Sequence, residues 1–143
     1  MHNFNLIAIS ESSLTPDIPD EQIEIPGYIS LRNDLPTEDT HGGVLIYHRI
    51  DLPAKRRPDL ETLPNLLVVE LSISRKKVFL VLVYRKYGQN ADQFVDYIAK
   101  MDELLAKLDA ENSYSTVLAG DFNAHLSQWW EGDSDDNFGI KTN

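Results

Sequence analysis

Asp121 and Asn123 follow an apolar run, two positions apart, and form the strongest chemical signal in the chain. The run, residues 117–120, predicts a buried strand because it is apolar and ends at a glycine. If strand geometry continues, both side chains point to one side, because side chains alternate along a strand. A carboxylate beside a carboxamide can ligate Mg2+ or orient a phosphate or an attacking water. The alternative is an Asx-type turn that closes the strand, and these residues alone favour the turn.

A second carboxylate, Glu11, follows another short apolar run at residues 6–9, which also predicts a buried strand. If the two strands lie side by side or face each other, Glu11, Asp121 and Asn123 form an oxygen-rich pocket. Mg2+ prefers such ligands, with positions left for water and phosphate. The alternative for Glu11 is an exposed loop carboxylate.

Four segments, in this order, resemble motifs of the endonuclease/exonuclease/phosphatase superfamily. That superfamily includes deoxyribonuclease I, the apurinic/apyrimidinic endonucleases and the endonuclease domains of LINE-type (non-LTR) retrotransposons. The segments are residues 6–12, similar to the strand with the metal-binding Glu; 42–47, similar to the glycine-led strand; 83–85, similar to the strand-end Tyr; and 120–125, similar to the Gly-Asp-Phe-Asn motif. The pair Trp129-Trp130 is especially like the retrotransposon branch.

The resemblance implies an α/β fold of the deoxyribonuclease I type, a mixed β-sandwich flanked by helices. It implies phosphodiester hydrolysis that depends on Mg2+, with Mn2+ as the alternative, by a DNA endonuclease of retrotransposon type. It assigns metal ligation to Glu11 and catalytic positioning to Asp121 and Asn123. It also implies that Tyr84 donates a hydrogen bond to a nonbridging oxygen of the scissile phosphate. The alternative for Tyr84 is a half-buried strand aromatic with its hydroxyl in water.

Arg85 and Trp129 are the candidate substrate-binding residues. Arg85 would supply positive charge next to the phosphate, or it would only cap the strand. Trp129 would stack on a base or wedge against DNA, although one of two adjacent aromatics often enters the core. His125 follows the Asp-Asn motif and is interpreted as a supporting or surface residue.

Two family features are missing from the sequence: an earlier strand that carries an Asn at the metal site, and a later Ser-Asp-His motif that supplies the catalytic His. Residues 1–143 are therefore expected to form a partial domain with little or no activity of its own. Two alternatives stay open. One is an inactive fragment or acidic binding module, and the other is a phosphatase or phosphodiesterase that acts on a small phosphorylated substrate.

Composition sets further limits. The chain has 143 residues, 42% hydrophobic and 25% charged, which are ordinary values for one globular domain. The longest apolar run, residues 78–84, is far too short to cross a bilayer, and the amino terminus lacks a secretory signal. With no cysteine, a disulfide-linked partner and a thiolate metal site are excluded. An intracellular location, nucleus or cytoplasm, is compatible with this.

The net charge of −10 argues against a simple nucleic-acid binder, because such proteins usually carry basic patches. DNA is nevertheless the partner expected for the complete domain. Three basic clusters either face a phosphate backbone or lie in solvated loops: residues 55–57, 75–77 and 85–86.

The elements that must position these residues follow from periodicity. Residues 66–73 and 78–84 predict two buried strands joined by residues 74–77 as a hairpin, whereas 51–65 predicts a surface loop. Residues 90–110 predict one helix, with Asn90 as N-cap and Gln93 as capping-box partner. Five apolar side chains form the stripe expected to pack on the sheet: Phe94, Ile98, Met101, Leu105 and Leu108.

Overall fold

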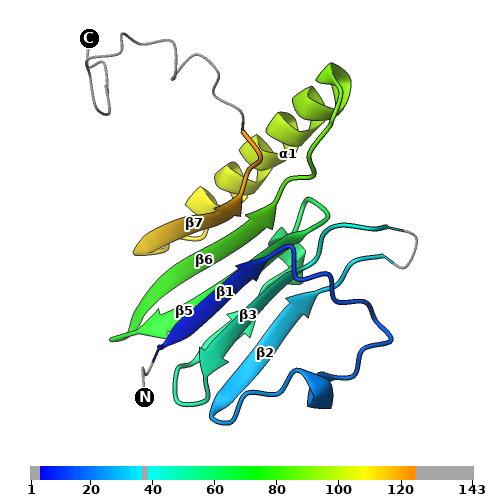
Figure 1. Cartoon of the computed structure of the whole chain (residues 1–143). Coiled ribbons are helices and arrows are strands. Elements are labelled where there is room, and N and C mark those ends of the chain that lie inside the picture. The colour runs from blue at the N-terminus through cyan, green and yellow to red at the C-terminus, as the bar shows by residue number, and fades with distance from the viewer. Residues whose placement is uncertain (1–3, 37–38, 125–143) are drawn as a thin grey trace, which may run out of the picture.

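The computed structural model describes residues 4–36 and 39–124. In that part of the chain, two β-sheets face each other and one α-helix covers the outer side of the larger sheet (Figure 1). The smaller sheet is antiparallel, with β3 between its two neighbours. Its strands, in spatial order, are β1 (Leu6–Ser10), β3 (Val44–Arg49) and β2 (Tyr28–Asn33).

The larger sheet is mixed. Its strands, in order, are β4 (Ala54–Arg56), β5 (Leu66–Ile73), β6 (Lys76–Tyr84) and β7 (Ser115–Asp121). The pair β6–β7 is parallel, so the chain must cross over between them, and the helix α1 (Ala91–Ala110) makes that crossover. Two single-turn 3-10 helices, Asp20–Gln22 and Pro58–Leu60, lie in the connections.

Two apolar layers stabilise this arrangement. One fills the space between the sheets, and β5 and β6 contribute to it through alternate residues such as Leu67, Leu82 and Tyr84. The other lies between β5, β6 and α1 and uses the opposite face of the same strands, for example Val68 and Val83. Because β5 and β6 are buried on both faces, their sequences read as continuous apolar runs.

The helix begins as its sequence predicts, but it turns a different stripe toward the sheet. The side chains of Asn90 and Gln93 form the expected capping box. The buried residues are Tyr97, Met101, Leu104 and Leu108. Three members of the expected stripe are instead 45–48% exposed: Phe94, Ile98 and Leu105. Both stripes have the same spacing, so periodicity alone could not choose between them.

The prediction that residues 51–65 form a plain surface loop is partly wrong. Within residues 51–65, β4 pairs with β5, and Leu60 and Leu63 are buried under α1. The three prolines suggested a loop, but an edge strand of three residues tolerates prolines at its flanks. The β5–β6 hairpin is confirmed, with a turn shorter than expected. It consists of Ser74 and Arg75, which have φ values of 51° and 64°.

The fold gathers three strand ends. In Figure 1 the arrowheads of β1, β6 and β7 point toward the same end of the molecule, and β1 contacts both β6 and β7. Residues that follow these three strands therefore meet at one edge. In the described part of the chain, no helix is long and apolar enough to cross a membrane.

Candidate functional site

Glu11 is held in place directly after β1. Its φ is 56°, in the left-handed region that a residue with a long side chain rarely adopts. The next two backbone N–H groups, of Ser12 and Ser13, donate to the carbonyls of Gly43 and Gly42 at 3.1 and 2.9 Å. A Cβ on Gly43 would lie 2.7 Å from the Ser12 hydroxyl oxygen, so the glycine allows this close approach. These bonds fix the direction in which Glu11 leaves the sheet.

Asp121 is placed by close pairing of β7 with β6. In the parallel register Asp121 lies opposite Tyr84, and Gly120 lies opposite Val83. Gly120 has a φ of 139°, and a Cβ there would lie 1.8 Å from the Val83 carbonyl oxygen. The glycine of the motif is therefore needed for β7 to approach β6.

Asn123 and Asp121 form the Asx turn that the residues alone had favoured. The Asn123 N–H donates to Asp121 Oδ1 at 2.9 Å, and Asn123 has a φ of 44°. The strand ends at Asp121, so strand alternation does not place the two side chains as expected; the turn instead ties the Asp121 carboxylate to the Asn123 backbone. The turn and the motif are therefore one structure, and the turn orients the carboxylate and the carboxamide.

Tyr84 joins these groups. It is 5% exposed, which rules out the half-buried alternative with its hydroxyl in water. Burial raises the pKa of its phenol, and a hydrogen bond with the Glu11 carboxylate raises it further, as does the negative charge of Glu11 and Asp121. A hydrogen bond with the Asn123 side chain lowers that pKa. The Tyr84 phenol thus interacts with Glu11, Asp121 and Asn123, so the structure brings these four residues to one place.

The Arg85 side chain forms its hydrogen bonds with other residues of the protein. Its guanidinium donates to the carbonyls of Phe122 and Asn123, and its Nη1 donates to Gln89 Oε1 at 3.0 Å. It also lies over the Phe94 ring, 5.2 Å from the ring centre. This geometry favours the strand-capping alternative over direct phosphate contact. The other candidate substrate-binding residue, Trp129, lies outside the described residues, as does His125.

Two site residues were not found by sequence reasoning. His41 Nδ1 lies 3.2 Å from Glu11 Oε1. Asn65 is 5% exposed; its carbonyl accepts from the Tyr84 N–H at 2.9 Å, and its Oδ1 accepts from the Gly43 N–H at 2.7 Å. Asn65 thus ties β6 to the glycine pair that supports Glu11. The sequence signal that could have identified Asn65 is its position just before a long apolar strand.

The donor set at this edge suits a hard divalent cation. Glu11 and Asp121 supply carboxylate oxygens and Asn123 an amide oxygen, and Mg2+ commonly uses one or two carboxylates with water and substrate phosphate as its other ligands. Across residues 4–36 and 39–124, no group of three or more His, Cys, Asp or Glu side chains could hold a metal by itself. A cation here would therefore need oxygen ligands from water or substrate.

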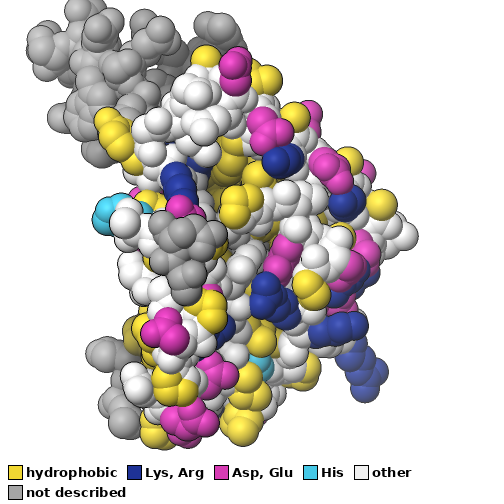
Figure 2. Space-filling view, turned by 90° about the vertical axis from the view of Figure 1, so that its right-hand side faces the viewer, with side chains coloured by type: hydrophobic (Ala, Val, Ile, Leu, Met, Phe, Trp, Pro, Cys, Tyr) yellow, Lys and Arg dark blue, Asp and Glu magenta, His cyan; other side chains and the backbone are white. Residues whose placement is uncertain are grey.

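The basic clusters are partly neutralised within the protein, while Lys55, Arg75 and Lys76 are exposed. Arg57 forms ion pairs with Asp59, Glu70 and Glu111, and Lys77 also pairs with Glu111. Figure 2 shows basic side chains next to acidic ones across this face. Residues 56–57 and 77 therefore join β4, β5, β6 and the end of α1, and their charge is not available to a phosphate backbone.

No protein-family model matches this chain, and no curated protein matches it in sequence. Among solved structures, the crystal structure of humanized D. rerio TDP2 carrying 14 mutations is similar, with a TM-score of 0.56 and 16% sequence identity. The similarity covers 87% of this chain and 51% of that one, so this chain spans about half the length of the TDP2 chain. It confirms the mixed α/β fold with two sheets, which this chain shares with that structure.

Proposed function

We propose that this chain contributes the metal-ligand and phosphate-contact residues of a phosphodiester hydrolase that depends on Mg2+, or on Mn2+ as the alternative. One observation carries the proposal. Glu11 follows β1 and Asp121 ends β7, so the two are distant in sequence. Both lie near the hydroxyl of Tyr84 at the end of β6, and the negative charge of each raises its pKa. Two carboxylates, an amide and a protonated phenol at one strand edge suit hydrolysis of a phosphate ester.

Each residue has a distinct task in this proposal. Glu11, with Asp121, would hold the cation, which when bound would polarise a phosphoryl oxygen and offset its negative charge. Tyr84 stays protonated because its pKa is raised, and its O–H, which hydrogen-bonds the Glu11 carboxylate here, would turn to a phosphate oxygen once Glu11 holds the cation. Asn123 is fixed by its own turn and by Arg85, so its carboxamide orients the phosphate or the attacking water without first being ordered.

The substrate we propose is DNA, cut by an endonuclease of the retrotransposon type. The order of the four sequence motifs supports this proposal, whereas the similarity to TDP2 concerns the fold alone. The internal pairing of Arg57 and Lys77 implies that these two side chains do not contribute phosphate contacts. The alternative substrate, a small phosphorylated molecule, would need no basic surface at all.

The test is nicking of supercoiled plasmid in Mg2+ by the whole protein that contains these residues. We expect metal-dependent nicking that falls by about a hundredfold or more in Asp121→Ala. The matched control is Asp109→Ala on the exposed side of α1, which should nick at the wild-type rate. Wild-type nicking by Asp121→Ala would overturn the site. Hydrolysis of p-nitrophenyl phosphate without nicking would overturn the nuclease assignment in favour of a phosphatase.

A further inference from the structure

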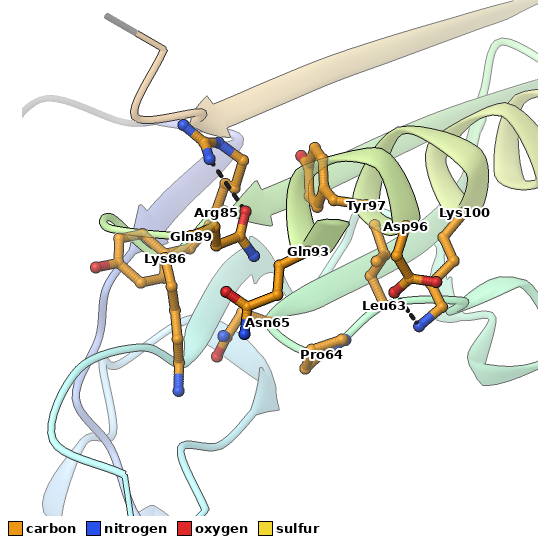
Figure 3. A pocket seen from close by; sticks show the side chains of 11 residues that line it. Leu63, Pro64, Asn65, Arg85, Lys86, Gln89, Gln93, Asp96, Tyr97 and Lys100 are labelled. Carbon is orange, nitrogen blue, oxygen red and sulfur yellow. Dashed lines mark hydrogen bonds and ion pairs between the residues drawn. The ribbon is translucent and has the colours of Figure 1, made fainter. Parts of the chain in front are cut away.

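A pocket of about 170 Å3 lies beside the candidate site (Figure 3). The end of β6, residues 63–65 and the first turns of α1 form its wall, and Tyr84 belongs to both the pocket and the site. At about 30 Å3 per liquid water molecule, the pocket holds about six waters. It is therefore large enough for one phosphate group and too small for a drug-sized ligand.

Three carboxamides in this wall present hydrogen-bond donors. The oxygen of each amide is already occupied by an N–H donor: Asn65 Oδ1 by Gly43 N at 2.7 Å, Gln89 Oε1 by Arg85 Nη1 at 3.0 Å, and Gln93 Oε1 by Asn90 N at 3.0 Å. These bonds fix which end of each amide is oxygen and which is nitrogen. The end left for the pocket is in each case the NH2 group.

The other polar side chains of the wall do not add free donors to these amides. Tyr97 is 8% exposed, and its hydroxyl, which has no hydrogen-bond partner within the described residues, is itself buried. Lys86 also lines the pocket, and its ammonium is paired with Asp39, with Nζ 2.5 Å from Oδ2. The one carboxylate of the wall, Asp96, is paired with Lys100 at 2.8 Å, and Figure 3 shows this pair away from the Gln89 amide.

We propose that this pocket binds a second phosphate of the substrate strand, next to the phosphate that is cut. A wall with three amide NH2 groups complements a ligand that offers only acceptors, as a phosphate does. A neutral base carries both donors and acceptors and would leave part of this wall unmatched. The inference rests on the proposed function, because it takes Tyr84 as the contact to the neighbouring scissile phosphate.

The first experiment measures binding without metal and without catalysis. Inorganic phosphate is titrated into the 15N-labelled chain at constant ionic strength, and the side-chain NH2 peaks of Asn65, Gln89 and Gln93 are followed. We expect saturable shifts of these peaks that an equal titration with chloride does not produce. Gln93→Glu should weaken the binding by about tenfold or more, because a donor becomes a like charge. The variant keeps the oxygen that caps α1, so the fold is retained.

Gln22→Glu is the matched control, because it makes the same change at an exposed position outside the pocket. Shifts that do not saturate, unchanged phosphate affinity in Gln93→Glu, or equal weakening by Gln22→Glu would overturn the proposal. Asp121→Ala should bind phosphate as the wild type does. Loss of nicking with phosphate binding intact therefore concerns the proposed function and not the pocket.

The second experiment identifies the source of the phosphate. A dinucleotide with one phosphodiester and a trinucleotide with two are compared for affinity without metal. We expect the trinucleotide to bind more tightly, and Gln93→Glu to remove that advantage. Equal affinity of the two, with inorganic phosphate still bound, would overturn the second-phosphate assignment and identify the pocket as a site for free phosphate.

Discussion

Arg85 and Asn123 each donate a side-chain hydrogen bond to the other residue's main-chain carbonyl. The Asn123 Nδ2 donates to the Arg85 carbonyl at 2.7 Å, and the Arg85 guanidinium donates to the Asn123 carbonyl. The Arg85 N–H also donates to the Asp121 carbonyl at 2.8 Å. These bonds join the segments that follow β6 and β7, so Tyr84 and Asp121 are held at a fixed separation.

Arg85→Lys should loosen this junction. A lysine has no planar fork, so it cannot reach the Phe122 and Asn123 carbonyls and Gln89 together. We expect the free energy of unfolding in urea to fall by about 1–3 kcal/mol and amide exchange at Asn123 to accelerate. The control is Arg49→Lys, whose guanidinium pairs with Asp51 at an exposed site and should change stability little. Equal effects of the two variants would show that Arg85 has no special positioning role.

Gly120→Ala should be strongly destabilising. The added Cβ would lie 1.8 Å from the Val83 carbonyl oxygen, so β7 would have to move away from β6. We expect a loss of about 3 kcal/mol or more in unfolding free energy.

Gly27→Ala is the control that separates the effect of a Cβ clash from the effect of backbone strain. Gly27 also has a positive φ, 86°, but nothing lies within 4 Å of the position of an added Cβ. That variant should lose only about 1 kcal/mol, the cost of the left-handed backbone. A Gly120→Ala protein as stable as Gly27→Ala would contradict the close approach of the two strands.

Glu111 should contribute to stability in acid. Hydrogen bonds from Arg57, and then from Lys77, lower the pKa of its carboxyl from 4.5 to about 2. A carboxyl with a lowered folded-state pKa stabilises the protein above its ordinary pKa, and that contribution is lost as the pH falls from 4.5 toward 2. Glu111→Gln should therefore lower the urea midpoint near neutral pH and make it less dependent on pH in this window. Glu21→Gln, on an exposed 3-10 turn, is the control. If both variants lost stability in acid as steeply as the wild type, this contribution would be disproved.

The sequence predicted the fold because its elements carry local signals. The strands β5 and β6 are mostly apolar, and Asn90 and Gln93 predict the start of α1. The stripe of α1 that faces the sheet was predicted wrongly, because Leu104 and Leu105 are equally apolar and only the packing chooses between them. The motif at Asp121 was visible, but the support from Arg85, Asn65 and His41 was not. That support depends on strands that pair across long stretches of sequence.

Tyr84→Phe should reduce hydrolysis while leaving the fold intact. The ring still fills the layer between the sheets, but the hydroxyl that contacts Glu11 and Asn123 is lost. We expect the rate of plasmid nicking to fall by about tenfold to a hundredfold. Tyr114→Phe, at a ring that is 67% exposed, should nick normally. In an absorbance titration, the phenol removed by Tyr84→Phe should ionise above the ordinary pKa of 10. Wild-type nicking by Tyr84→Phe would exclude a role for its hydroxyl.

The central claim is that Glu11 and Asp121 hold one cation beside Tyr84, and a Mn2+ titration of the 15N-labelled chain tests it most directly. The account predicts that the amide peaks of these three residues broaden together at the same low Mn2+ concentration, because paramagnetic broadening reports proximity. Glu11→Gln should abolish the broadening at all three. Broadening at Glu11 without Asp121, or only along the acidic residues of α1, would contradict the account.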